Sequence, residues 1–327
     1  MKRYLIGLVA SCCIAAAIAS LQGCGSSVSA QEAAPTPNYP QVADTSAATA
    51  GAAAFFSGYF AARSQYSVDG IMARFSDPRA TFYDATVGWG FDNSAALKAI
   101  VAQIVPTWGV GGLSYPTRIL GDEISVIVAL TDTKELFGAE IRTLSAVDMK
   151  NGKIVRWVDY WDSRTIPASI DASLRLPPAQ FATDFKESQV GESASVLMKS
   201  TANALQQALA AGDAQSAGAL FSYDAVFEDM TLRTQVSGKA AITRYLARII
   251  VQAPYGVGSP SIPRHVLGSD KGGGYEWRAS QLSGGKNGIF ALNLDASGAI
   301  TRLTTVYDGR VVQSAVLQSL AMLGVEP

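Results

Sequence analysis

Apolar and polar positions follow two patterns along this chain, one with helical spacing and one with the two-residue period of a strand. Helical spacing over 53–74 and 193–221 predicts a long helical region at each place, and shorter helices are expected over 94–104 and 239–251. Strands are expected over 80–86, 123–131, 137–149 and 154–162, and again over 225–232, 275–282, 288–294 and 300–307. The same order of helices, strand, helix and closing strands thus occurs twice, which predicts an α+β fold.

The two halves also match in sequence. The segment 82–86 (FYDAT) aligns with 227–231 (FEDMT), 152–156 (GKIVR) with 298–302 (GAITR), and 162–164 (DSR) with 308–310 (DGR). The spacing between matching positions changes by only one residue over this distance, which indicates a tandem repeat. The resulting division is 1–23 export signal, 24–52 flexible tether, 53–166 first repeat, 167–192 connector and 193–327 second repeat.

The first residues have the parts of an export signal. Lys2 and Arg3 precede a short apolar run over 4–18, and 21–24 (LQGC) resembles the bacterial lipobox. That resemblance implies cleavage before Cys24, lipidation of its thiol, and an anchor in the cell envelope, on the periplasmic side of the outer membrane. The alternative is an ordinary signal peptide cleaved after Ala30, which leaves a soluble periplasmic or secreted protein. In either case no contact with a membrane is expected other than through Cys24.

The amino-acid composition argues against several classes of partner and site. Hydrophobic residues make up 48% of the chain, charged residues 16%, and the formal net charge is −1, so the chain can bury large cores and lacks the basic excess that nucleic acid requires. All three cysteines lie within the first 24 residues, and the one histidine is His265, which is expected in a surface loop. We therefore expect no disulfide framework, no metal site and no cofactor.

Three segments resemble the nuclear transport factor 2-like superfamily, and its SnoaL-like polyketide cyclase branch in particular. They are 82–84 (FYD), 95–97 (AAL) and 151–162 (NGKIVRWVDYWD). The resemblance implies two tandem cone-shaped barrels of the cystatin-like type, each with helices packed on a curved antiparallel sheet. It also implies a pocket for a small molecule inside the cone. Homodimers of this superfamily pair through sheet faces, so we expect the two repeats to pack as an intramolecular pseudo-dimer.

The closing strand of the first repeat contains the strongest candidate for chemistry. Its two-residue period places Trp157, Asp159 and Trp161 on one face. If this face lines the cavity, the indole rings desolvate the carboxyl group, raise its pKa and suit it to proton transfer. If the face turns outward, Asp159 is solvated and the tryptophans pack on the connector or on the other repeat.

Asp84 is the second candidate acid. The family resemblance places Asp84 and Phe82 at the mouth of the same pocket, with Asp84 sharing the catalysis and Phe82 contacting the substrate. Asp84 recurs as Asp229 in the second repeat, which also fits a structural role at the following turn.

Besides Trp157, Trp161 and Phe82, three further residues are candidates for substrate binding. Glu140 and Arg142 share a strand face and form either a charge pair that orients substrate or an exposed pair of little energetic value. Trp89 belongs to an aromatic loop, 88–91 (GWGF), that fits a pocket lid and equally fits simple packing.

The second repeat is less well equipped, because Thr305 replaces Asp159, and Leu303 and Tyr307 replace the tryptophans. The function predicted from the sequence is an exported, cofactor-free enzyme of the lyase or isomerase type. It uses acid–base catalysis on a small hydrophobic substrate that is aromatic, steroid-like or polyketide-like. The alternative is a non-catalytic, lipid-anchored binding or envelope assembly module.

Overall fold

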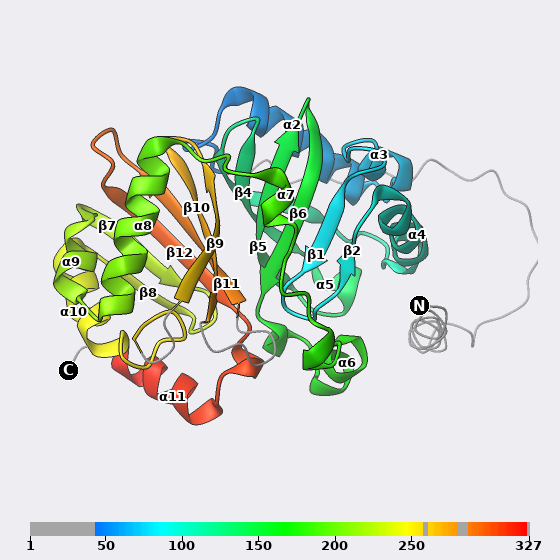
Figure 1. Cartoon of the computed structure of the whole chain (residues 1–327). Helices are drawn as coiled ribbons and strands as arrows, with labels where there is room; N and C mark the ends of the chain where they lie inside the picture. Colours follow the sequence, from blue (N-terminus) through cyan, green and yellow to red (C-terminus); the bar gives the residue numbers. More distant parts are fainter. Residues whose placement is uncertain (1–42, 258–260, 280–286, 326–327) are drawn as a thin grey trace, which may run out of the picture.

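The computed structural model describes residues 43–257, 261–279 and 287–325. It contains two six-stranded sheets with strand orders β2-β1-β6-β5-β4-β3 and β8-β7-β12-β11-β10-β9. The two orders are the same when counted from the start of each repeat. In Figure 1 the sheets face each other, and helices cover their outer faces. The α+β architecture with two sheets, predicted from the sequence, is confirmed.

The first repeat and the connector contain the following elements. Its strands are β1 (Thr81–Asp84), β2 (Gly90–Phe91), β3 (Ser114–Gly121), β4 (Ser125–Asp132), β5 (Ile141–Lys150) and β6 (Lys153–Trp161). Its helices are α2 (Ala50–Ser64), α3 (Val68–Met72), α4 (Ser94–Ile104), η1 (Val105–Thr107), α5 (Lys134–Phe137) and η2 (Ser163–Thr165). The connector contains α6 (Ala168–Leu174), η3 (Pro178–Gln180) and α7 (Glu187–Val190).

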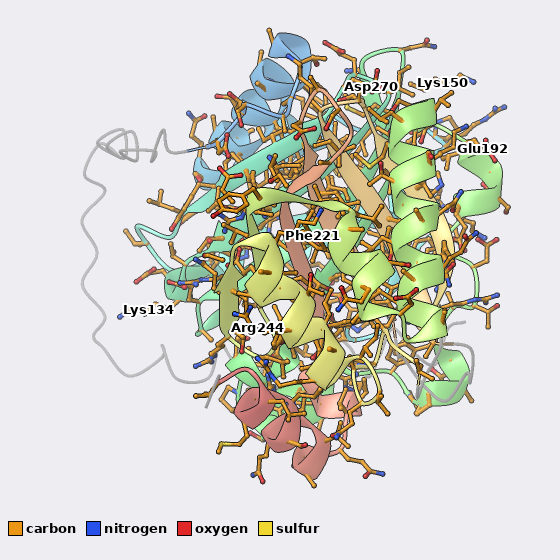
Figure 2. The ribbon with its side chains drawn as sticks, turned by 90° about the vertical axis from the view of Figure 1, so that its left-hand side faces the viewer. Lys134, Lys150, Glu192, Phe221, Arg244 and Asp270 are labelled. Carbon is orange, nitrogen blue, oxygen red and sulfur yellow. The ribbon has the colours of Figure 1, made fainter. Side chains whose placement is uncertain are left out.

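The second repeat follows the same plan. Its strands are β7 (Phe221–Asp229), β8 (Thr234–Ser237), β9 (Ser261–Gly268), β10 (Gly272–Ala279), β11 (Asn287–Leu294) and β12 (Ile300–Tyr307). Its helices are α8 (Val196–Ala211), α9 (Ala214–Ala219), α10 (Lys239–Ile249), η4 (Gly309–Val311) and α11 (Ser314–Leu323). Figure 2 looks onto α8 and α10, which lie in front of the second sheet.

Local sequence signals explain where the main helices begin. The side chains of Thr49, Asn93 and Ser195 each accept a hydrogen bond from a backbone N–H in the first turn of α2, α4 and α8. These caps satisfy donors that have no partner within the helix. Helix α8 ends at Gly212, whose φ of 71° lies in the left-handed region that glycine adopts without strain.

Each sheet is mixed rather than wholly antiparallel, which corrects the sequence expectation. The first strand of each repeat pairs with the last strand, β1 with β6 and β7 with β12, and both pairs are parallel. The other strand pairs are antiparallel. The four-strand meander β3–β6 therefore ends on a strand that runs beside β1 in the same direction.

Four strands had no counterpart in the sequence analysis: the short β2 and β8, and the longer β3 and β9. β3 and β9 form the outer edges of their sheets, and they contain Pro116 and Pro263. A proline cannot donate a ladder hydrogen bond, so it weakens the strand pattern and is tolerated at a sheet edge.

The segment before α2 belongs to the folded body. Asp44 and Ala48 form isolated bridges with Arg118 and Gly121 of β3, and Ala47 is buried. The tether expected over 24–52 therefore does not include 43–52, because these residues pair with the edge of the first sheet. Residues 1–42, with the expected signal and Cys24, lie outside the described residues.

Apolar side chains fill the space between the two sheets. A cluster of buried residues joins both repeats: Ala47, Tyr83, Ala85, Leu120, Ile127, Ala129, Leu144, Ala146, Val158, Tyr160, Phe185, Leu267, Ile289, Ala291 and Val306. Separate cores lie between each sheet and its own helices. Each sheet thus packs on both of its faces, which explains why every residue of β4 is buried.

A buried ionic cluster lies within this apolar layer. Arg156 of β6 is fully buried and pairs with Glu276 of β10 at 2.6 Å and with Asp148 of β5 at 3.0 Å. The Tyr160 hydroxyl donates to Glu276 at 2.7 Å, and a ring nitrogen of His265 lies 2.8 Å from Asp148. His265 is therefore a buried residue of β9 and not the surface loop residue expected from the glycines that follow it.

No helix in the described ranges is long and apolar enough to cross a membrane.

Candidate functional site

Asp84 and Asp159 lie side by side because β1 and β6 are parallel neighbours. In this pairing Asp84 is in register with Asp159, and Phe82 with Trp157. Alternation along β6 turns Trp157 into the core under α2, whereas Val158 and Tyr160 point into the layer between the sheets. The face that carries Trp157 and Asp159 is thus the one covered by helices.

The two oxygen atoms of the Asp159 carboxyl group differ in their hydrogen bonds. Its Oδ1 accepts hydrogen bonds from the Ser145 hydroxyl and from the Trp157 indole N–H, both at 2.5 Å. Its Oδ2 accepts none from the described residues, and the residue is half-buried. One oxygen is therefore fixed in position while the other is free to exchange a proton.

The pKa of Asp159 is raised to about 7, chiefly by burial and also by the neighbouring Asp84 carboxylate. The hydrogen bonds from Ser145 and Trp157, and the positive charge of Arg63, act in the opposite direction. Desolvation is the largest of these effects. A carboxyl group with a pKa near neutrality can both accept and return a proton under physiological conditions.

Asp84 has a different environment. Its Oδ1 accepts the backbone N–H groups of Thr86 and Val87 at 2.8 and 3.0 Å, and its Oδ2 accepts the Trp161 indole N–H at 3.0 Å. Burial raises the pKa of Asp84, and these three hydrogen bonds oppose the rise. Both oxygens are occupied, so the contacts of Asp84 are those of a residue that holds the turn after β1.

The two indoles serve different carboxyl groups, which corrects the picture of Asp159 between two rings. Trp157 is fully buried and lies 5.0 Å from the Tyr59 ring, whereas Trp161 bonds to Asp84. Trp161 packs in a small cluster with Val87 and neighbours from the connector. Of the two indole N–H groups, that of Trp157 therefore donates to Asp159 and that of Trp161 to Asp84.

The remaining predicted residues are dispersed. Phe82 is half-buried beside Phe91, with ring centroids 6.3 Å apart, at the edge of the core below α4. The Trp89 indole donates to the Leu174 carbonyl at 2.7 Å, so its polar group is engaged with α6.

Glu140 and Arg142 do not belong to the site. They pair with each other at 2.9 Å, and their side chains are 52% and 69% exposed. The structure corrects their assignment to substrate binding, because they lie at the exposed start of β5. They form the exposed pair that was the alternative interpretation.

A buried ion pair near Asp159 was missed. Arg63 in the last turn of α2 pairs with Asp132 of β4 at 2.9 Å, and its guanidinium lies 5.6 Å from the Trp108 ring. The available signal was the helical spacing from Tyr59 to Arg63, which places this cation on the buried face of α2. Nothing in the sequence identified its partner on a distant strand.

The second repeat retains one carboxyl group in a closed environment. Asp229 is fully buried and accepts the Leu232 N–H at 2.9 Å and the Tyr255 hydroxyl at 3.2 Å. Burial raises the pKa of Asp229 to about 7. Thr305, which replaces Asp159, donates its hydroxyl to the Ile289 carbonyl at 3.0 Å. Asp229 thus corresponds to Asp84, and the partly exposed acid of the first repeat has no counterpart here.

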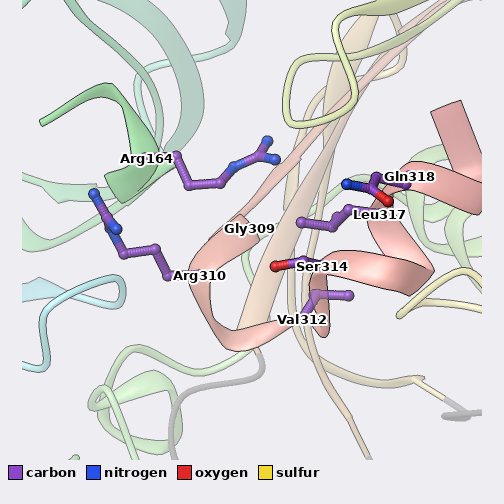
Figure 3. Close-up of a pocket in the computed structure, with 7 residues that line it drawn as sticks. All are labelled: Arg164, Gly309, Arg310, Val312, Ser314, Leu317 and Gln318. Atoms are coloured by element: carbon purple, nitrogen blue, oxygen red, sulfur yellow. The ribbon is translucent and has the colours of Figure 1, made fainter. Parts of the chain in front are cut away.

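Metal ligands do not gather anywhere in the described ranges: no group of three or more His, Cys, Asp or Glu side chains there could hold an ion. A groove of about 380 Å³ lies at the junction of the repeats, lined by Arg164, Gly309, Arg310, Val312, Ser314, Leu317 and Gln318 (Figure 3). The Arg164 guanidinium is held by Asp162 and by the Thr231 carbonyl, so it is engaged in the junction. None of the predicted site residues lines this groove.

No protein-family model matches the sequence. No curated protein matches it either. Among solved structures, a protein from Silicibacter pomeroyi with a cystatin-like fold is 19% identical, over 39% of this chain and 85% of its own, with a TM-score of 0.31. A steroid delta-isomerase from Pseudomonas aeruginosa is 16% identical, over 41% of this chain and 93% of its own, with a TM-score of 0.30. A SnoaL-like protein of unknown function from Burkholderia thailandensis is 10% identical, over 35% of this chain and 98% of its own, with a TM-score of 0.31. At these scores the similarity assigns no reaction to this chain.

Proposed function

We propose that the first repeat is a cofactor-free acid–base enzyme in which Asp159 moves a proton on a small, mostly apolar substrate. The observation that carries this proposal is the state of Asp159, which is half-buried, has a pKa of about 7 and keeps one oxygen without a partner among the described residues. The aromatic side chains around it, Trp157 and Tyr59, favour an apolar substrate.

The chemistry follows from these positions. In its ionised form Asp159 accepts a proton from an activated C–H bond of the substrate, whose electron pair moves to a neighbouring electron-withdrawing group. The resulting carboxylic acid then returns the proton to another carbon, which gives isomerisation, or to a leaving group, which gives elimination. Ser145 and Trp157 hold Oδ1 throughout, so the free Oδ2 stays in a fixed orientation.

The experiment is hydrogen–deuterium exchange into a panel of uncharged aromatic and alicyclic ketones in D₂O, read by mass spectrometry. Wild-type protein and an Asp69→Asn variant, in which the replaced side chain is 90% exposed, should promote exchange equally. Asp159→Asn should abolish it. Equal exchange with and without the Asp159 carboxyl group rules the proposal out.

The alternative is a non-catalytic binding or envelope assembly module. It is favoured by the second repeat, in which the remaining carboxyl group, Asp229, is fully buried and held by the chain itself. Absence of exchange with every ketone, together with binding of one of them, would support this alternative.

We also propose that the chain is exported and anchored in the cell envelope through a lipidated Cys24. The support for this is the sequence 21–24 (LQGC) after a short apolar run.

A further inference from the structure

The ion pair of Arg63 and Asp132 lies in the same core as Asp159 and has no part in the proton transfer proposed above. Arg63 comes from the last turn of α2 and Asp132 from the end of β4, and their side chains are 14% and 7% exposed. Tyr59 lies one turn before Arg63 on α2 and packs on Trp157, whose indole N–H donates to Asp159. The charge of Arg63 also lowers the pKa of Asp159, so the ion pair and Asp159 belong to the same buried region of the first repeat.

This pair leaves hydrogen-bonding capacity unused. Three buried atoms have no hydrogen-bond partner among the described residues: Arg63 Nε, Asp132 Oδ1 and Trp108 Nε1. Asp132 as a whole is more than nine-tenths buried. Buried polar atoms in native proteins are nearly always satisfied, so three such atoms around one ion pair indicate that a ligand or water supplies the partners.

The charges around the pair restrict what that ligand can be. Arg63 is neutralised by Asp132, and Asp159 adds a further negative charge whenever it is ionised. A ligand that brings its own carboxylate would leave one cation facing three anions in a region of low dielectric, which is strongly unfavourable. An uncharged acceptor oxygen can instead use the free donors without adding charge.

We propose that Arg63 binds the carbonyl oxygen of an uncharged, apolar substrate, and that Asp132 is a positioning residue which orients the guanidinium and excludes anionic analogues. The inference rests on the proposed function, because it places the activated C–H bond next to the carbonyl group that Arg63 holds. When Asp159 removes the proton, the negative charge moves to this oxygen, where the guanidinium stabilises it.

The test measures binding by full-length protein of three probes that share a naphthalene ring: 2-acetylnaphthalene, 2-ethylnaphthalene and 2-naphthoate. Wild type should bind the ketone at least about tenfold more tightly than the hydrocarbon, as expected for a hydrogen bond from a charged donor, and should bind 2-naphthoate least tightly. Arg63→Met should lose the preference for the ketone and keep the affinity for the hydrocarbon. Arg142→Met, in which the replaced side chain is 69% exposed, is the matched control and should behave as wild type.

Asp132→Asn gives a second readout that retains the arginine. Removing the counter-charge should reverse the discrimination, so that this variant binds 2-naphthoate at least about tenfold more tightly than wild type does, and Arg63→Lys should keep part of the ketone preference. No ketone preference in wild type, or unchanged naphthoate affinity in Asp132→Asn, overturns the inference. A ketone preference that depends on Arg63 but comes with no deuterium exchange keeps this inference and rejects only the proton-transfer role of Asp159.

Discussion

Asp162 and Asp308 occupy equivalent positions in the two repeats, and each carboxylate accepts a backbone N–H of the other repeat. Asp162 Oδ1 accepts the N–H of Gly309 at 3.1 Å. Asp308 Oδ1 accepts the N–H and the hydroxyl of Ser163 at 3.2 and 2.8 Å. This reciprocal pattern has the form of a two-fold symmetric interface within one chain.

These contacts predict that the repeats unfold together. Asp308→Ala leaves two buried donors of Ser163 without this acceptor and removes one of two ion-pair partners of Arg175, the other being Asp171. The free energy of unfolding should fall by about 2–4 kcal/mol, measured by urea titration. Asp224→Ala, at an exposed position of β7, is the control. A variant as stable as wild type, or separate transitions for the two repeats, would contradict the prediction.

The ionic cluster between the sheets makes a second prediction. Glu276→Gln removes one negative charge from a site where Arg156 is fully buried. Asp148 still pairs with Arg156 in this variant, but the glutamine has only one acceptor oxygen for the two donors that Glu276 accepts, Arg156 and the Tyr160 hydroxyl, so a loss of about 1.5–3 kcal/mol is expected in chemical denaturation. Glu140→Gln, at an exposed pair, should change stability by less than about 1 kcal/mol. Equal losses in the two variants would show that burial of the cluster has no energetic consequence.

Asp229 should make stability depend on pH. Its pKa is raised from 3.8 to about 7 in the folded chain, so the folded state binds more protons than the unfolded state between these values. Stability from this group is therefore present at low pH and is lost as pH rises through that window. Asp229→Asn should remove this slope and should be more stable than wild type at pH ~8 by on the order of a few kcal/mol. Urea titrations at several pH values measure it, and an unchanged slope would contradict it.

Asp159→Asn should lower turnover by about 10²–10⁴, because it removes a positioned proton acceptor while keeping its shape. Wild-type activity that requires ionised Asp159 should rise with pH through about 7.

Asp84→Asn should act mainly on stability, since both Asp84 oxygens already accept hydrogen bonds, from the turn after β1 and from Trp161. Thr305→Ala, in the second repeat, should leave turnover unchanged. If Thr305→Ala abolishes activity and Asp159→Asn does not, the active site lies in the second repeat and the assignment to the first repeat is wrong.

Processing at the N-terminus can be tested directly. Mass spectrometry of the membrane fraction should find a mature chain that begins at a diacylated or triacylated Cys24, and Cys24→Ala should block processing or release the protein. An unmodified N-terminus at Gln31 would indicate the ordinary signal-peptide route.

Local patterns predicted much of the fold. The expected helix over 94–104 coincides with α4, and the expected strand over 300–307 coincides with β12, because one face of each is apolar and turn or capping residues flank it. The edge strands β3 and β9 were missed, since Pro116 and Pro263 interrupt their patterns. Local patterns do not show which strands pair across the chain, so they did not predict the parallel pairing of β1 with β6.

The same limit applies to the candidate site. Alternation along β6 placed Trp157 and Asp159 on one face, and the structure turns that face toward the helices. The pairing of Arg63 with Asp132 joins residues 69 positions apart, and no sequence spacing indicates it. The exposure of Glu140 and Arg142 depends on where β5 begins, which the pattern placed too early.

The parallel pairing of β1 with β6 also governs when the site can form. Asp84 and Trp161 are 77 positions apart along the chain, and Asp84 meets Asp159 only after the whole meander between them has been made. Closing so long a loop costs chain entropy before any contact compensates for it. During synthesis, β1 therefore has no partner on its β6 side until β6 has left the ribosome, and a chain that stops before β6 lacks both Asp159 and Trp157, the indole that donates to it.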